Sequence, residues 1–180
     1  MIIDSSSLII FAKIKKLDIL LKLYKPLSIT KETYKETVEQ GIIINAPDAK
    51  IINEFVESKK IKIKDLDKTY AKLSKELRNI YSQLGFGESE AIALTLQEGD
   101  NMLIMDEELG RDVAKLYNLK PVGSLRILLE AYKENILDEQ KLRETVREMI
   151  KNKFRLGAEV IDEFWVVFDK IKKGRINKKQ

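Results

Sequence analysis

Two short apolar runs that each end in an aspartate constrain the fold of this chain most. Residues 102–105 are Met-Leu-Ile-Met and are followed by Asp106, while residues 1–3 are Met-Ile-Ile and are followed by Asp4. Short apolar runs of this kind are typical of buried parallel strands. Because open parallel sheets bind ligands at the carboxyl ends of their strands, both aspartates are expected at one functional edge.

The segment before the second run predicts a buried helix. Gly87 opens it, and residues 91–96 are apolar on nearly every side. Glu88 and Glu90 lie in its first turn. We therefore expect both acids at the rim of the core, close to the edge where the strands end.

The rest of the chain alternates between predicted strands and helices. Further strands are expected at residues 27–29, 61–63 and 119–122. The last is expected at an edge of the sheet, because Pro121 cannot donate to a ladder. Helices are expected over residues 5–13, 17–24, 30–40, 48–58, 68–84, 87–96, 108–117, 124–133, 138–151 and 158–172. This alternation predicts a three-layer α/β/α sandwich with four or five mostly parallel strands and additional C-terminal helices.

The predicted helix over residues 30–40 brings one more acid to the functional edge. Thr30 is its expected cap and Gly41 its expected stop. By their i, i+3 and i+4 spacing, Thr33, Glu36, Thr37 and Gln40 are expected to share one face of this helix. The spacing therefore predicts that Glu36 reaches whatever ligand Asp4 faces.

The composition restricts the chemistry that a site can use. The 180 residues include no Cys and no His, which excludes Ser-His and Cys-His nucleophiles and the usual nitrogen and sulfur ligands of zinc. Oxygen ligands suit Mg²⁺ and Mn²⁺. Clustered carboxylates repel unless one is protonated or a cation lies between them, so a cluster of these acids predicts a metal site.

Four segments, taken in order, form a recognisable pattern: Met1-Ile2-Ile3-Asp4-Ser5, Ile29-Thr30 through Tyr34-Lys35-Glu36, Gly87 through Leu94, and Leu103-Ile104-Met105-Asp106 through Gly110-Arg111. This pattern resembles the PIN-domain family, and most closely its prokaryotic VapC-like branch. The resemblance covers residues 1–135 and leaves residues 136–180 as a helical extension with a basic tail. It implies an α/β/α nuclease that binds Mg²⁺ or Mn²⁺ and hydrolyses single-stranded RNA. A toxin-type nuclease with an antitoxin partner is one form of that activity.

Carried over residue by residue, the resemblance implies catalytic roles for Asp4, Glu36, Glu90 and Asp106, and metal ligation by these four and Glu88. The third position is more often Asp in the family, and Glu88 and Glu90 remain alternatives for it, with Glu90 expected to matter more. A hydroxyl residue commonly stands two positions before the fourth acid, where this chain has Ile104. Metal-activated water would supply the nucleophile without a side-chain base.

Each candidate also has a purely structural explanation. Asp4 is a good helix cap, and acids in a first helical turn complement the helix dipole. Ser5 or Ser6 either caps the helix or hydrogen-bonds a phosphate. Arg111 either pairs with Glu107 or Glu108 across one turn or contacts a phosphate.

Two other function classes fit parts of the sequence. One is a PIN fold that binds RNA or a protein partner without cutting. The other is a receiver-like signalling domain, suggested by Asp65 and by Lys120-Pro121 near the last strand. A receiver, however, needs an acid pair after its first strand and a Ser or Thr where Asp106 stands.

The C-terminal extension suggests contacts with partners. Its last predicted helix carries a wide apolar face: Val160, Ile161, Phe164, Trp165, Val167, Phe168 and Ile171. Such a face favours a homodimer interface, unless the helix packs back on its own chain. Residues 141–180 hold twelve basic and six acidic residues, and the terminal Lys and Arg residues are candidates for contacts with RNA phosphates: Lys170, Lys172, Lys173, Arg175, Lys178 and Lys179.

The sequence shows neither a targeting segment nor a membrane span. Residues 1–11 lack a basic region and include Asp4, unlike a signal peptide. No apolar run approaches the roughly 18 residues that a span needs. We expect a cytoplasmic protein.

Overall fold

The computed structural model describes residues 1–152, 154 and 157–177, and for residues 175–177 it describes the backbone alone. The chain divides into two compact units, Met1–Ser124 and Leu125–Gln180. Within the described ranges, no helix is both long and apolar enough to cross a membrane.

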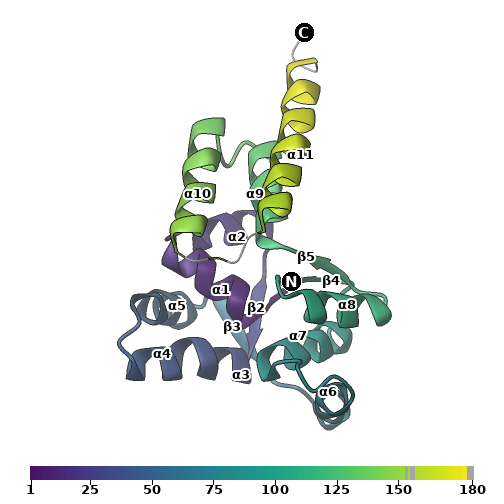
Figure 1. Cartoon of the computed structure of the whole chain (residues 1–180). Helices are drawn as coiled ribbons and strands as arrows, with labels where there is room; N and C mark the ends of the chain where they lie inside the picture. Colours follow the sequence, from purple (N-terminus) through teal and green to yellow (C-terminus); the bar gives the residue numbers. More distant parts are fainter. Residues whose placement is uncertain (153, 155–156, 178–180) are drawn as a thin grey trace. The chain divides into compact units, whose positions relative to one another are not determined.

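The first unit is built on a five-stranded sheet in which every pairing is parallel (Figure 1). Its strands are β1 (Ile2–Ile3), β2 (Leu27–Thr30), β3 (Ile61–Lys64), β4 (Met102–Ile104) and β5 (Lys120–Val122). Their spatial order is β3-β2-β1-β4-β5. The predicted α/β/α class is confirmed, and Pro121 lies in an edge strand as expected.

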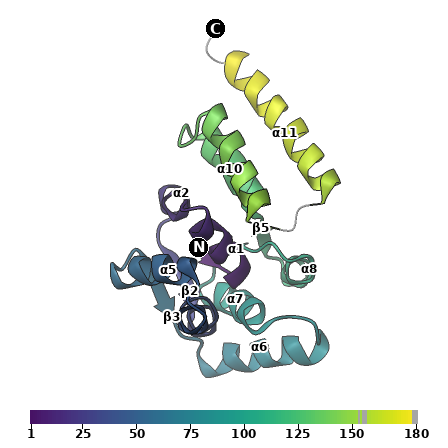
Figure 2. The same cartoon turned by 60° about the vertical axis from the view of Figure 1, so that its left-hand side comes forward.

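Helices cover both faces of this sheet, as Figures 1 and 2 show. One face carries α1 (Ser5–Lys13) and α5 (Pro47–Glu57), with the short α2 (Leu17–Leu23) after α1. The other carries α6 (Lys68–Ile80), α7 (Phe86–Gln97) and α8 (Glu108–Leu116). These three helices bury a continuous core with β1 and β4 that includes Ile2, Leu77, Ala91, Ile92, Leu94, Leu103 and Val113. The apolar α7 is thus buried as its sequence predicts.

The helix predicted over residues 30–40 is interrupted by a wider turn. The chain forms α3 (Lys31–Tyr34), the π-helical turn η1 (Lys35–Glu39) and α4 (Gln40–Ile43). A π turn alters the angular spacing of side chains, so the prediction that Thr33, Thr37 and Gln40 share one face with Glu36 is wrong. Gln40 is exposed, while Thr33 and Thr37 are buried. Such turns occur frequently at functional sites, and this one contains Glu36.

Gly41 does not end this helix, so its predicted role as a stop is wrong. It lies inside α4, where an added Cβ atom would be 2.7 Å from the Cβ atom of Ala49 in α5. Glycine is needed here because two helices approach each other closely, and a one-dimensional pattern does not reveal such a contact.

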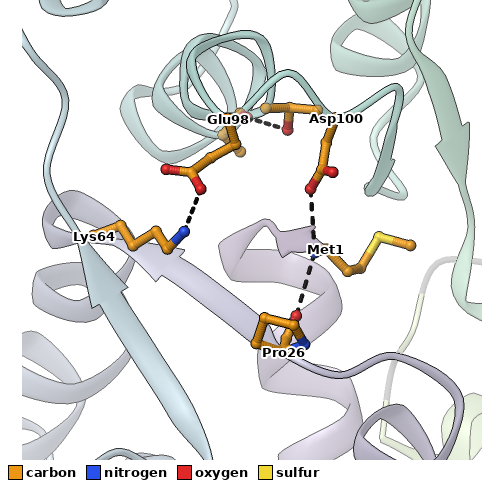
Figure 3. A network of polar contacts seen from close by, with 7 residues as sticks. Met1, Pro26, Lys64, Glu98 and Asp100 are labelled. Atoms are coloured by element: carbon orange, nitrogen blue, oxygen red, sulfur yellow. Dashed lines mark hydrogen bonds and ion pairs between the residues drawn. The ribbon is translucent and has the colours of Figure 1, made fainter.

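Polar contacts connect the amino ends of the central strands (Figure 3). The α-amino group of Met1 donates to the carbonyl oxygen of Pro26 at 3.2 Å and pairs with the carboxylate of Asp100 at 3.3 Å. Nearby, Lys64 pairs with Glu98. The contacts of Met1 connect the segments that precede β1, β2 and β4, whereas Lys64 is the last residue of β3 and Glu98 follows α7.

The described residues of the second unit form three helices: α9 (Ser124–Lys133), whose first residue belongs to the first unit, α10 (Glu139–Lys151) and α11 (Ala158–Asn177). The rings of Tyr132 and Phe168 lie 4.9 Å apart, and the Arg143 guanidinium lies 4.7 Å from the Trp165 ring centre. Much of the aromatic face of α11 therefore packs on α9 and α10.

Candidate functional site

The first two site acids follow neighbouring strands. Ile3 of β1 pairs with Ile104 of β4, and the Asp4 N–H donates to the Ile104 carbonyl oxygen at 3.1 Å. Asp4 and Asp106 therefore lie at the carboxyl ends of β1 and β4. The strand order reverses between these two strands, which is where open α/β sheets bind ligands. The sequence predicted this placement of the two aspartates.

Asp4 caps α1 and is also part of a hydroxyl network. Its carboxylate accepts the Ser7 N–H at 2.9 Å, so the predicted capping role is real. It also accepts the Ser6 hydroxyl at 3.1 Å. The Ser7 hydroxyl donates to Asp106 at 2.8 Å. The first turn of α1 thus connects the two aspartates through serines, and capping does not exclude a functional role for Asp4.

Asp106 also accepts hydrogen bonds from Ser124, a contact that the sequence did not predict. The Ser124 N–H donates to its Oδ1 at 2.7 Å, and the Ser124 hydroxyl donates to its Oδ2. Ser124 is fully buried and follows β5, the next strand along the sheet edge. The one local feature of the sequence that could have indicated this contact is the position of Ser124 just after the end of β5. Ser7 and Ser124 supply hydroxyls at Asp106, although Ile104 supplies none.

Glu36 and Glu88 are positioned by the start of α7. The Gly87 N–H donates to Glu36 at 3.2 Å, and the Ser5 hydroxyl donates to the same carboxylate. The Gly85 N–H donates to Glu88 at 2.7 Å, which closes the capping interaction of the helix. The π turn and the α7 start, separated by about fifty residues, therefore bring these two acids to one place.

Burial and crowding perturb the ionisation of two of these acids. Burial, together with the smaller effect of the Asp106 charge, raises the pKa of Asp4 to about 7 against the hydrogen bonds from Ser7 and Ser6. Burial also raises the pKa of Glu88, and the charges of Glu107 and Glu36 add to the effect. Both shifts have the cause that characterises carboxylates gathered in a site.

Glu88 and Glu90 face different directions. Residues two apart on an α-helix are separated by about 200° around its axis. Glu88 is the one close enough to Glu36 and Glu107 to feel their charges. Glu90 is half-buried, and no contact with the other candidate acids is found for it in the described part of the chain.

Space around the acids is kept open by glycines. Three glycines lie where an added Cβ atom would approach a site carboxylate: Gly87 at 2.5 Å from Glu36, Gly110 at 3.4 Å from Glu88 and Gly123 at 3.3 Å from Asp106. Because a real Cβ atom almost never comes within 3.0 Å of another atom, a side chain at position 87 would displace Glu36.

Arg111 of α8 lies beside Asp106 rather than pairing along its own helix. Its Nη1 donates to the Met105 carbonyl oxygen at 3.4 Å, and an added Cβ at Gly123 would meet this nitrogen at 2.7 Å. No ion pair joins Arg111 to Glu107 or Glu108 in the ranges described. The remaining sequence-based alternative, a phosphate contact, fits a guanidinium at this edge.

Comparison with known proteins agrees with this arrangement. A family model described as a PIN domain matches residues 1–170. The chain belongs to the PIN-domain family. Comparisons with curated proteins and with solved structures gave no match. The family match assigns no branch, so the VapC-like assignment stays a prediction.

Membership in the PIN family makes the fold nuclease-like, since PIN domains are generally nucleases that use divalent metals. The strand order differs from the 2-1-3-4-5 order of receiver domains. The receiver-like alternative therefore has no support.

The donor set of this PIN domain suits a hard cation. Carboxylate and hydroxyl oxygens surround the strand ends, and such ligands are preferred by Mg²⁺ and Mn²⁺. The charge of Asp106 acts on Asp4, and the charges of Glu107 and Glu36 act on Glu88. Among the residues described, no group of three acidic side chains converges on one metal position. The donor chemistry fits the metal of the family, although the acids do not converge on one position in the described residues.

Proposed function

We propose that this PIN domain is a metal-dependent endoribonuclease that hydrolyses phosphodiester bonds of single-stranded RNA. The observation that carries the proposal is the meeting of Asp4 and Asp106 at the strand-order switch, with serine hydroxyls donating to both. Family membership supports the nuclease class, and the oxygen-only donor set supports Mg²⁺ or Mn²⁺ as the cofactor.

Asp4, Glu36, Glu88 and Asp106 would hold the cation. When bound, Mg²⁺ or Mn²⁺ supplies positive charge at the scissile phosphate and promotes attack by water. Ser7 and the other serines orient the carboxylates, so few side chains need to reorganise during the reaction. Because the chain has no His, no imidazole takes part in proton transfer.

A cleavage assay tests this function. We expect the protein to cut single-stranded members of a mixed RNA panel in Mn²⁺ or Mg²⁺, to stop when a chelator is added, and to resume when metal is restored. RNA that is bound but stays intact in both metals would contradict the proposal. That result would favour the alternative of a PIN fold that binds RNA or a partner without cutting.

The third acid can be identified by comparing two matched variants. The family pattern favours Glu90, but the contacts of Glu88 with Gly85 and its closeness to Glu36 lead us to propose Glu88. Glu88→Gln should lower cleavage by about 100-fold, because losing one metal-binding charge removes several kcal/mol of stabilisation. The Gln side chain can still cap the helix. Glu90→Gln should change the rate by less than about 3-fold, and the reverse order would restore Glu90 as the ligand.

Self-association is a further part of the proposal. Of the predicted apolar face of α11, Phe164 and Phe168 are buried, whereas Val160 is 48% exposed. The uncovered part of the apolar face is therefore smaller than the sequence suggested. If it forms a homodimer, Val160→Glu should give a folded monomer in sedimentation, while Glu163→Gln should sediment like the parent. A monomeric parent would rule out the dimer.

The proposed contact of the basic tail with RNA rests on fewer residues than the sequence suggested. Lys172 pairs with Glu139 at 2.7 Å within the second unit. Lys178 and Lys179 lie outside the described residues, and so does the side chain of Arg175. The phosphate-binding role of this segment, an antitoxin partner and a cytoplasmic location all stay predictions.

A further inference from the structure

A large aromatic side chain is exposed at the start of α7, the helix that also carries Glu88. Phe86 is the first residue of α7, and 57% of its surface is exposed. The guanidinium carbon of Arg78, from α6, lies 4.1 Å from the centre of its ring. Phe86 therefore presents an aromatic surface to solvent that is supported by a cation.

Hydrogen bonds to two buried serines position Arg78 and the backbone of Phe86. The Nη1 of Arg78 donates to the hydroxyls of Ser74 and Ser89, each at 2.7 Å. The Ser89 hydroxyl in turn donates to the Phe86 carbonyl oxygen at 2.9 Å. Ser74 is 2% exposed and Ser89 is fully buried. An aromatic group ordered in advance loses little entropy when a ligand stacks on it.

The backbone of Phe86 is adjacent to the candidate active site, while its ring packs toward α6. Phe86 is flanked by Gly85, whose N–H binds Glu88, and by Gly87, whose N–H binds Glu36. A polynucleotide with a phosphate at these acids lies near the start of α7, where the Phe86 ring is exposed. Nucleobases stack on aromatic rings regardless of sequence, and Arg strengthens such platforms.

We propose that Phe86, supported by Arg78, is a stacking platform for a nucleobase of single-stranded RNA, close to the phosphodiester that lies at the acids. This inference rests on the proposed nuclease function and adds to it a defined base-binding position. Stacking on a ring reads no base edge, so the platform accepts any base and favours purines, which offer the larger surface.

Binding to two related strands tests the platform without cleavage. The probes are a fluorescein-labelled single-stranded oligoadenylate and an abasic strand of the same length, both measured by anisotropy in chelator over a series of salt concentrations. Phe86→Ala should weaken adenylate binding by about 10-fold, within the usual range for loss of one stacked base. The salt dependence should keep its slope, because no phosphate contact is removed. Phe86→Tyr should restore binding.

The matched control is Ile80→Ala. Ile80 is 67% exposed on the same helix as Arg78, but two positions away it faces a different direction. This control should bind both strands like the parent. The parent and Phe86→Ala should bind the abasic strand equally, because that strand has no base that could stack on residue 86.

Three results would overturn the platform: Phe86→Ala binding adenylate like the parent, Phe86→Ala losing the same factor on both strands, or a parent that does not bind adenylate. Cleavage in Mn²⁺ is measured separately. A parent that needs Phe86 for binding but leaves RNA intact would overturn the nuclease proposal alone. A parent that cleaves but binds without any contribution from Phe86 would overturn the platform alone.

Discussion

Asp106→Asn is expected to lower metal-dependent RNA cleavage by at least about 100-fold, because it removes a charge that is worth several kcal/mol at the metal. The fold should be kept. The Asn carbonyl oxygen can still accept the Ser124 N–H, which donates to Oδ1 of the aspartate at 2.7 Å. The measurement is the initial rate of RNA cleavage in Mn²⁺, with circular dichroism as the check on folding.

Asp112→Asn is the matched control for this prediction. Asp112 lies on α8, and its side chain is 60% exposed and pairs with Lys115. The same chemical change there should leave the cleavage rate within about 2-fold of the parent, since exposed ion pairs contribute little. If Asp106→Asn cleaves as fast as this control, the site is misplaced.

Asp4→Asn should make the metal-free protein more stable at neutral and alkaline pH. The folded state holds the pKa of Asp4 at about 7 and the ordinary value is 3.8. Between these values the folded state binds a proton that the unfolded state has released, so stability falls as pH rises and levels off above the folded pKa. Asn has no carboxyl group to ionise, so Asp4→Asn avoids this loss. Its free energy of unfolding should exceed that of the parent by up to about 4 kcal/mol at high pH, which is the free energy of the full pKa shift of Asp4.

Chemical unfolding in chelator, at about pH 5 and at about pH 8, measures this effect. The difference in unfolding free energy between Asp4→Asn and the parent should be larger at the higher pH. Asp4→Ala is the informative control, because Asn can still cap α1 and Ala cannot. The Ala variant should be about 1 kcal/mol less stable than the Asn variant. A difference that does not change with pH would contradict the raised pKa of Asp4.

The order of elements in this protein follows from local sequence patterns. An apolar run followed by an acid predicts a buried strand with the acid at its carboxyl end. This pattern correctly predicted Asp4 and Asp106 at the carboxyl ends of β1 and β4. Pro121 placed β5 at the edge, because a missing N–H is a property of the residue itself. Patterns of this kind act over a few residues, so they can be read without the fold.

The contacts that organise the site depend on the tertiary structure. Ser7 donates to Asp106 across 99 positions in the sequence, and the Gly87 N–H meets Glu36 across 51. The role of Ser124 and the choice between Glu88 and Glu90 depend on such contacts. Helical periodicity also failed at the π turn. Local patterns determine which face of an element is buried, but only packing determines which distant side chain lies opposite, and the acids are brought together at that level.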